Sequence, residues 1–147
     1  MSLTTVTGPA ATVVTAPAYA TARSARSLRR TTVVAGLVAA GAVTGVAAAV
    51  HTAGVSFSVD GEMIPLAGFA QMTFLGAVIG GVLLAVFNRR SGAARRRFVE
   101  TVVALAALSC VPSVVWPDDV ASKVALVALH VLAAAIIVPA LVRHAHD

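Results

Sequence analysis

The chain has little charge. Of its 147 residues only 12% are Asp, Glu, Lys or Arg, and 59% are hydrophobic, whereas soluble globular domains average about 25% charged residues. This shortage of charge excludes an ordinary soluble domain. A chain of this length and composition has room for about four membrane spans with short connections, and none for an additional folded soluble domain.

The chain also lacks the residue patterns from which many sites are built. Cys110 is the single cysteine, so the chain forms no intramolecular disulfide and no cysteine-based zinc site. No catalytic, metal-binding or nucleotide-binding motif is present in the sequence, so we expect no cofactor and no enzymatic activity. The one enzymatic alternative is an intramembrane hydrolase that uses Ser109 and His130, although no acidic residue accompanies them to orient the histidine.

Aromatic residues are scarce at 5%, and this bears on the net charge of +5. A basic chain can bind nucleic acid, but the arginines here flank apolar runs, and no aromatic platform accompanies them. We therefore expect no nucleic-acid binding. The positive charge is better explained as the signal that orients a protein in its membrane.

Long apolar runs are abundant. The clearest extends from Leu66 to Phe87, 22 residues without a formal charge, and at about 1.5 Å per residue it crosses a hydrocarbon core of roughly 30 Å. Pro65 precedes this run, and two arginines follow it closely. The sequence as a whole predicts an all-α membrane protein, a four-transmembrane-helix bundle with spans at about 31–51, 65–87, 98–115 and 120–142.

The first thirty residues differ from the rest, because they are rich in Thr, Ala and Ser and contain no acidic residue. They predict a disordered cytoplasmic tail, residues 1–30, ahead of a transmembrane domain at 31–143 and a short cytoplasmic end at 144–147. A cleaved signal peptide is the alternative, since SLRRTTVVAG loosely matches a twin-arginine signal and residues 47–49 are small. The long tail and the three spans that follow argue against cleavage.

The placement of basic residues predicts the topology. Four arginines lie in the tail, five in residues 88–97 and one after the last span, so ten of the eleven Lys and Arg share one side, with Lys123 on the other. By the positive-inside rule, both termini are cytoplasmic in a multi-pass protein of a bacterial plasma membrane. Glu100 pairs locally with an arginine. We expect a cytoplasmic anchor that binds anionic lipid, formed by Arg89, Arg90, Arg95, Arg96 and Arg97.

The connections on the opposite side carry local signals. Residues 55–64 alternate apolar residues with serines ahead of Asp60-Gly61, which predicts a short extracytoplasmic hairpin between the first two spans. Asp118 and Asp119 precede the fourth span, where their carboxylates can cap the helix.

Three spans each carry a polar residue at a similar depth. Gln71, Ser109 and His130 lie six or seven residues from the outer end of their spans, or about 10 Å at the helical rise. We expect them to form an interhelical hydrogen-bonded layer. The alternative is a polar pocket open to the outside, with His51 at its mouth and with His130 changing charge with pH. Metal binding by the two histidines lacks carboxylate or cysteine partners.

Glycines four residues apart form a second pattern. Gly41 and Gly45 lie in the first span, and Gly76 and Gly80 lie in the second. Such pairs let two helix backbones approach closely, so they predict a close helix crossing.

Two segments carry a resemblance. VDGEMIPLAGFAQMTFLGAVIG, residues 59–80, and LHVLAAAIIVPAL, residues 129–141, resemble a family of small actinobacterial four-helix integral membrane proteins of unknown function. The resemblance covers about Thr31 to Val142 and implies a membrane location and four helices, without any reaction.

These observations favour a non-enzymatic membrane component that self-associates or binds a membrane-protein partner. The alternative is a small transporter, channel or sensor with an outward-facing polar pocket. A transporter usually has discontinuous helices or a polar path that reaches both faces, whereas the intramembrane polar residues here are confined to the outer third of the spans.

Overall fold

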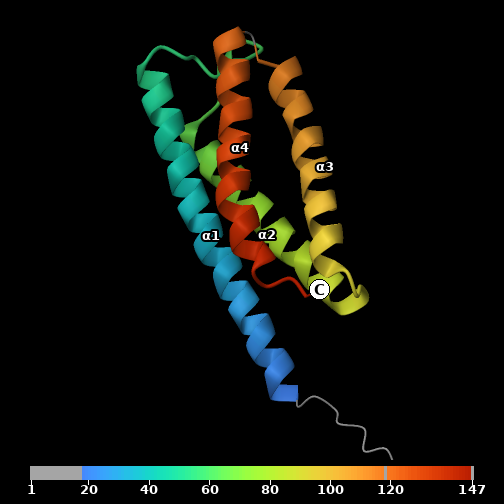
Figure 1. Ribbon diagram of the computed structural model, residues 1–147. Coiled ribbons are helices and arrows are strands. Elements are labelled where there is room, and N and C mark those ends of the chain that lie inside the picture. The colour runs from blue at the N-terminus through green and yellow to red at the C-terminus, as the bar shows by residue number, and fades with distance from the viewer. Residues whose placement is uncertain (1–17, 118, 147) are drawn as a thin grey trace, which may run out of the picture.

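Four helices cross the molecule from end to end. The computed structural model describes residues 18–117 and 119–146 (Figure 1), and in that part each of the four helices is long and apolar enough to cross a membrane. The elements in chain order are α1 (Ala18–Thr52), β1 (Ser58–Val59), β2 (Glu62–Met63), α2 (Leu66–Arg90), α3 (Ala94–Val115) and α4 (Val120–Val142). The predicted four-helix membrane fold is confirmed.

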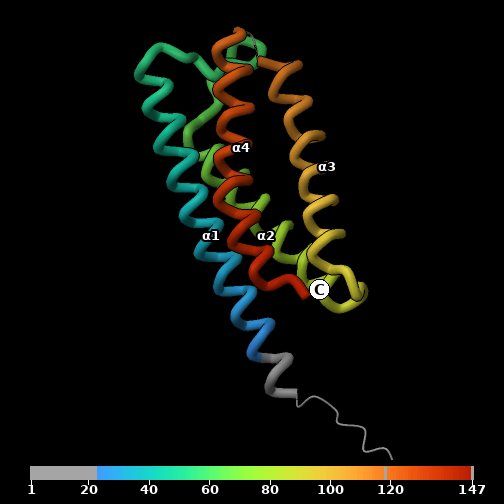
Figure 2. The backbone as a smooth tube through the Cα atoms, viewed as in Figure 1, coloured from blue at the N-terminus to red at the C-terminus, as the bar shows by residue number. Residues whose placement is uncertain are grey.

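Consecutive helices run in opposite directions and close into a ring. α1 packs against α2 and α4, and α3 packs against α4 and α2. Three residues separate α2 from α3, and four separate α3 from α4, so short connections enforce the antiparallel arrangement. Beyond α4 the chain turns toward the connection between α2 and α3 (Figure 2).

Helix α1 is longer than its apolar run. It begins at Ala18 and has 35 residues, so residues 18–30, which the sequence assigns to the disordered tail, are helical; residues 1–17 lie outside the described part of the chain. The physical reason is local, because this segment is rich in Ala and Arg, which favour helix, and contains neither Pro nor Gly after Pro17. The start of α1 therefore projects beyond the ring of helices (Figure 1).

The hairpin predicted between the first two spans is present. β1 and β2 pair antiparallel, with Val59 opposite Glu62. Asp60 (φ 53°) and Gly61 (φ 80°) between them are both left-handed, as a two-residue type I′ turn requires. Phe57 (φ 49°) is also left-handed, and its buried ring packs edge-on against Phe69 with centroids 5.2 Å apart.

Small residues do bring α1 and α2 together, but they are mostly not the predicted glycines. A Cβ added to Gly36 would lie 3.0 Å from the Cβ of Ala77, and one added to Gly81 would lie 2.7 Å from Thr32 Cγ2. The contact surface thus pairs Thr32 and Gly36 with Ala77 and Gly81, two pairs that are each four residues apart.

The predicted glycines separate into two groups. A Cβ on Gly80 would lie 3.2 Å from Leu141 Cδ1, so Gly80 packs against α4, whereas a Cβ on Gly41, Gly45 or Gly76 would meet no described atom within 4 Å. Of the four predicted glycines, only Gly80 therefore lies in a close contact within the described part of the chain. A spacing of four does not by itself say which face of a helix turns inward.

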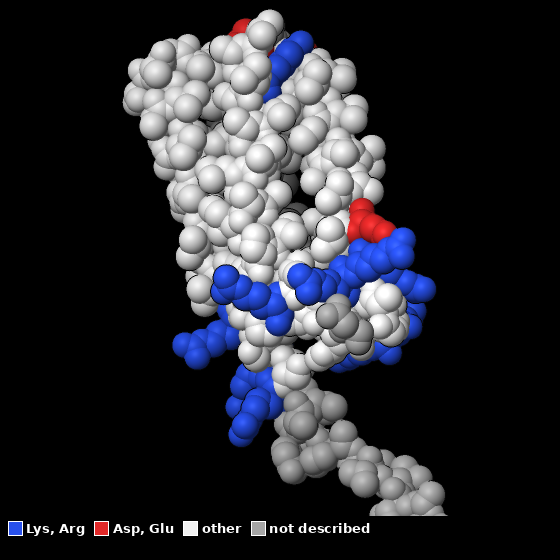
Figure 3. Space-filling model, in the orientation of Figure 1, with Lys and Arg blue, Asp and Glu red and all other residues white. Residues whose placement is uncertain are grey.

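Charge divides the molecule into two ends. Arginines gather at one end, and a broad uncharged belt separates them from the other end, where Lys123 lies in the first turn of α4 (Figure 3). We call the first the arginine end; it includes the five anchor arginines, all of them exposed. The other is the hairpin end, which includes β1, β2 and the connection between α3 and α4.

Candidate functional site

The predicted polar layer does not form in the described part of the chain. His130 Nδ1–H donates to Leu126 O (3.0 Å), and Ser109 Oγ donates to Ala106 O (3.0 Å). Gln71 is exposed, and none of the hydrogen bonds of the described residues joins any two of these three side chains.

The reason is that serine and histidine can satisfy their polar groups on their own helix. A bond to a carbonyl three or four residues earlier removes the need to turn toward another helix. His51 does the same locally, because its Nδ1–H donates to Val55 O (2.9 Å) and so holds the first residues after α1. Equal depth in the membrane therefore did not fix helix rotation.

Hydrogen bonds instead concentrate at the two ends of the bundle. At the hairpin end, Asp119 caps α4, accepting from Ser122 N–H (2.8 Å) and Ser122 Oγ–H (2.6 Å). Its Oδ2 also accepts from Ser56 Oγ (3.0 Å), and the buried Ser122 Oγ accepts from Phe57 N–H (3.0 Å). This hairpin-end cluster of Ser56, Phe57, Asp119 and Ser122 ties the loop between α1 and α2 to the start of α4.

The same bonds set the charge state of Asp119. The Ser122 hydroxyl, followed by the Ser122 backbone N–H, holds the pKa of Asp119 below its ordinary value of 3.8, and Ser56 acts in the same direction. Hydrogen bonds to a carboxylate favour its ionised form. Asp119 was predicted as a cap and is confirmed as one; Asp118 lies outside the described residues.

At the arginine end, one amide side chain joins the chain terminus to α2. Asn88 Nδ2–H donates to His144 O (2.8 Å), and Asn88 Oδ1 accepts from His146 N–H (3.1 Å). Thr31 Oγ1 on α1 is bonded to His144 Nε2 (2.9 Å), and Arg95 N–H on α3 donates to His146 O (3.3 Å). This arginine-end cluster of Thr31, Asn88, Arg95, His144 and His146 joins three helices to the residues after α4.

The arginines at this end and Glu100 are exposed. Arg96 and Glu100 form an ion pair of 2.7 Å with both side chains largely exposed, as expected for a local pair, and such pairs contribute little to stability. Within the described part of the chain, no group of three His, Cys, Asp or Glu side chains could hold a metal ion.

Comparison with known families matches residues 23–147 to the family of unknown function DUF6069. The chain belongs to DUF6069. The region matched to DUF6069 contains both end clusters and nearly all of the four helices. Comparison with curated proteins and comparison with solved structures each give no match. Membership in a family of unknown function, together with four helices long and apolar enough to cross a membrane, is consistent with an uncharacterised membrane protein.

Most residues of the hairpin-end and arginine-end clusters were not predicted from the sequence. Asn88, His144 and His146 stand at helix ends, where polar residues are ordinary, and their partners are 56 and 58 positions away. Ser56 lies in a loop and Ser122 in the first turn of a helix, where serines are common, so neither residue indicated a distant partner. The usable signal was an amide followed by arginines at the end of a span, since a half-buried amide has to find both donors and acceptors.

Proposed function

We propose that this DUF6069 protein is a non-enzymatic, multi-pass component of a bacterial plasma membrane that self-associates through the exposed face of α2. The observation that carries the proposal is Gln71. It is an exposed amide on a helix apolar enough to cross a membrane, and no partner for it is found among the described residues.

The surroundings of Gln71 are apolar. At about 100° per residue, five side chains of α2 share an arc of about 80°. Gln71 lies on this arc with Leu75, Ile79, Val82 and Val86, and all five are exposed. We call these five residues the outer face of α2. The buried Ala77, Gly81 and Leu84 are on the opposite side of the helix.

An apolar face alone does not drive association in a membrane, because lipid tails solvate it equally well. An amide in hydrocarbon differs, since leaving its hydrogen-bonding groups unpaired costs several kcal/mol. A second copy of the chain offers the same amide, so two Gln71 side chains can pair across a symmetric interface. Measured interhelical hydrogen bonds of this kind contribute about 0.6 to 2 kcal/mol.

The distribution of charge supports one orientation of the protein in the membrane. The arginine end is the cytoplasmic end by the positive-inside rule, which places both termini inside and the hairpin outside. The five exposed arginines that form the anchor would then face anionic headgroups of the inner leaflet. The resemblance of residues 59–80 supports an actinobacterial source.

Energy transfer between labelled copies in liposomes, measured over a range of protein-to-lipid ratios, tests self-association. We expect Gln71→Leu to weaken association by about 3- to 30-fold, the factor that corresponds to one interhelical hydrogen bond. Met72→Leu is the matched control, because Met72 is the exposed neighbour of Gln71. A wild-type chain that stays monomeric at every ratio, or equal effects of the two changes, would refute the proposal.

A further inference from the structure

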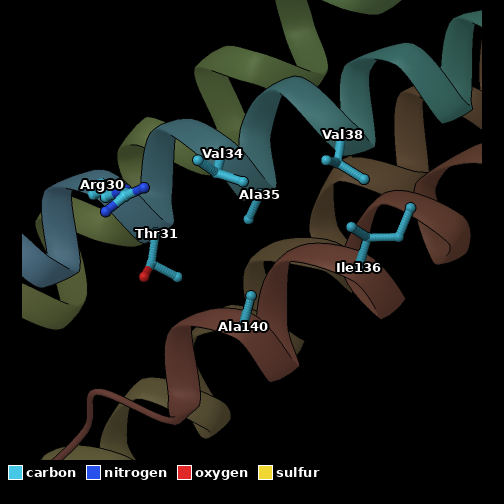
Figure 4. A pocket seen from close by; sticks show the side chains of 7 residues that line it. All are labelled: Arg30, Thr31, Val34, Ala35, Val38, Ile136 and Ala140. Carbon is cyan, nitrogen blue, oxygen red and sulfur yellow. The ribbon is translucent and has the colours of Figure 1, made fainter.

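A groove runs between α1 and α4 near the arginine end (Figure 4). Its volume is about 450 Å³, and it is lined by Arg30, Thr31, Val34, Ala35, Val38, Ile136 and Ala140. Two small residues face each other across it, Ala35 on α1 and Ala140 on α4 (Figure 4). The groove exists because these methyl groups leave unfilled the space that larger side chains would occupy.

The lining changes from polar to apolar along the groove. Arg30 and Thr31 lie at one end, and Val34, Val38 and Ile136 form walls farther in (Figure 4). Arg30 and Val38 are eight positions apart, which is about 12 Å along a helix. One leaflet contributes half of a hydrocarbon core of about 30 Å, so the groove extends through most of one leaflet.

Positively charged residues extend along α1 beyond the polar end of the groove. At about 100° per residue, Arg23, Arg30, Val34 and Val38 share an arc of about 80° on α1, and all four are exposed. Immediately after α4, the exposed Arg143 lies three positions beyond Ala140. Arginines of both helices therefore stand at the polar end of the groove, where a headgroup would lie.

We infer that this groove binds an anionic phospholipid from the leaflet at the arginine end. Arg30 contacts the phosphate, since a guanidinium pairs with phosphate oxygens in bidentate geometry. One acyl chain lies between Val34 and Val38 on one side and Ile136 and Ala140 on the other. This site is separate from the arginine anchor at residues 89–97 and from the outer face of α2, so it does not depend on self-association.

Charge complementarity selects this occupant. A purely apolar ligand would leave the arginines of both helices without a counter-charge, and a zwitterionic lipid offers them only a phosphate already balanced by its own cation. An anionic phospholipid matches both the apolar walls and the basic end. Each basic residue near a membrane surface adds attraction for anionic lipid that corresponds to about a five-fold change in affinity.

The test uses the full-length chain, delipidated in mild detergent and titrated with phosphatidylglycerol or with phosphatidylcholine of the same acyl chains. Thermal stabilisation reports binding. We expect the wild-type chain to be half-stabilised at a lower concentration of phosphatidylglycerol than of phosphatidylcholine. Arg30→Gln should raise the phosphatidylglycerol concentration needed by about five-fold, whereas Lys123→Gln, which removes a positive charge from the first turn of α4 at the hairpin end, should leave it unchanged.

A second pair of variants tests the acyl-chain part of the site. Ala140→Leu fills the groove and should weaken stabilisation by phosphatidylglycerol, whereas Ala135→Leu on the exposed side of α4 should not. Glycerol phosphate, which has the headgroup chemistry without the chains, should not stabilise the protein. Equal responses of Arg30→Gln and Lys123→Gln, or stabilisation by glycerol phosphate matching that by the lipid, would overturn the inference whether or not Ala140→Leu folds.

Discussion

Helices α1 and α3 are held in the bundle in different ways. In an apolar 18-residue stretch of α1, 33% of the residues are buried, whereas in the corresponding stretch of α3 only 11% are buried. α1 approaches α2 closely at Thr32 and Gly36, which lie against Gly81 and Ala77. The buried residues of α3 are Ala94 and Phe98 near one end and Ser113 near the other. α1 is therefore held by close approach of its backbone to α2, whereas α3 is held by contacts near its two ends.

The largest effect is expected where α3 is attached. Phe98→Ala should lower the free energy of unfolding by about 3 kcal/mol, because a fully buried ring is replaced by a cavity. Leu108→Ala in the middle of α3 is the control and should change stability by less than about 0.5 kcal/mol, since Leu108 is 66% exposed. Thermal unfolding in detergent measures both. Equal losses would mean that the middle of α3 is packed.

The next effect concerns the α1–α2 contact. Gly81→Leu should destabilise the bundle by about 1 to 3 kcal/mol, because its side chain would overlap Thr32 and force the helices apart. Gly76→Leu lies on the same helix with open space around its Cα and should be tolerated. Unfolding of both variants by the same assay decides, and a larger loss for Gly76→Leu would reverse the assignment of the faces.

A smaller effect is expected at the arginine-end cluster. Asn88→Leu leaves His144 O and His146 N–H without their amide partner, which should cost about 1 to 2 kcal/mol. Hydrogen exchange should show faster exchange of the His146 amide in this variant. Arg89→Gln changes the neighbouring exposed residue and serves as the control; comparable exchange in both would show that Asn88 does not hold the terminus.

The smallest effect is a pH dependence at the hairpin end. The pKa of Asp119 is lower in the folded chain than its ordinary value of 3.8, so its contribution is fully present above pH 3.8 and is lost as pH falls through the folded pKa. Asp119→Asn should reduce the loss of stability at low pH, and Asp60→Asn in the hairpin turn should not. Melting temperatures measured between about pH 2 and pH 7 test this prediction. If Asp119→Asn loses as much stability at low pH as the wild-type chain, the role of the hairpin-end cluster is contradicted.

Features that depend on a few neighbouring residues could be predicted from the sequence alone. Apolar runs located the spans, Asp60-Gly61 located the hairpin turn, and Asp119 was recognised as a helix cap. Each of these follows from a few consecutive residues and from the solvent around them.

The rotation of each helix about its axis, and the hydrogen bonds between residues far apart in the sequence, could not be predicted from local patterns. Gln71, Ser109 and His130 share a depth, but rotation decides what each side chain faces, and rotation depends on the packing of all four helices. The choice of Gly36 and Gly81 over Gly41 and Gly76 has the same origin. The arginine-end cluster joins Thr31 to His144, which are 113 positions apart, so no local pattern could reveal it.

Cysteine crosslinking at exposed positions of α2 and α3 distinguishes association of two copies through α2 from association through α3. Single cysteines replace Leu75 on α2 or Leu108 on α3, both exposed, in a Cys110→Ser background, and native membranes are oxidised. We expect a disulfide-linked dimer for Leu75→Cys that Gln71→Leu reduces, with little dimer for Leu108→Cys. Dimer formation through Leu108→Cys alone, or none at either position, would contradict association through α2.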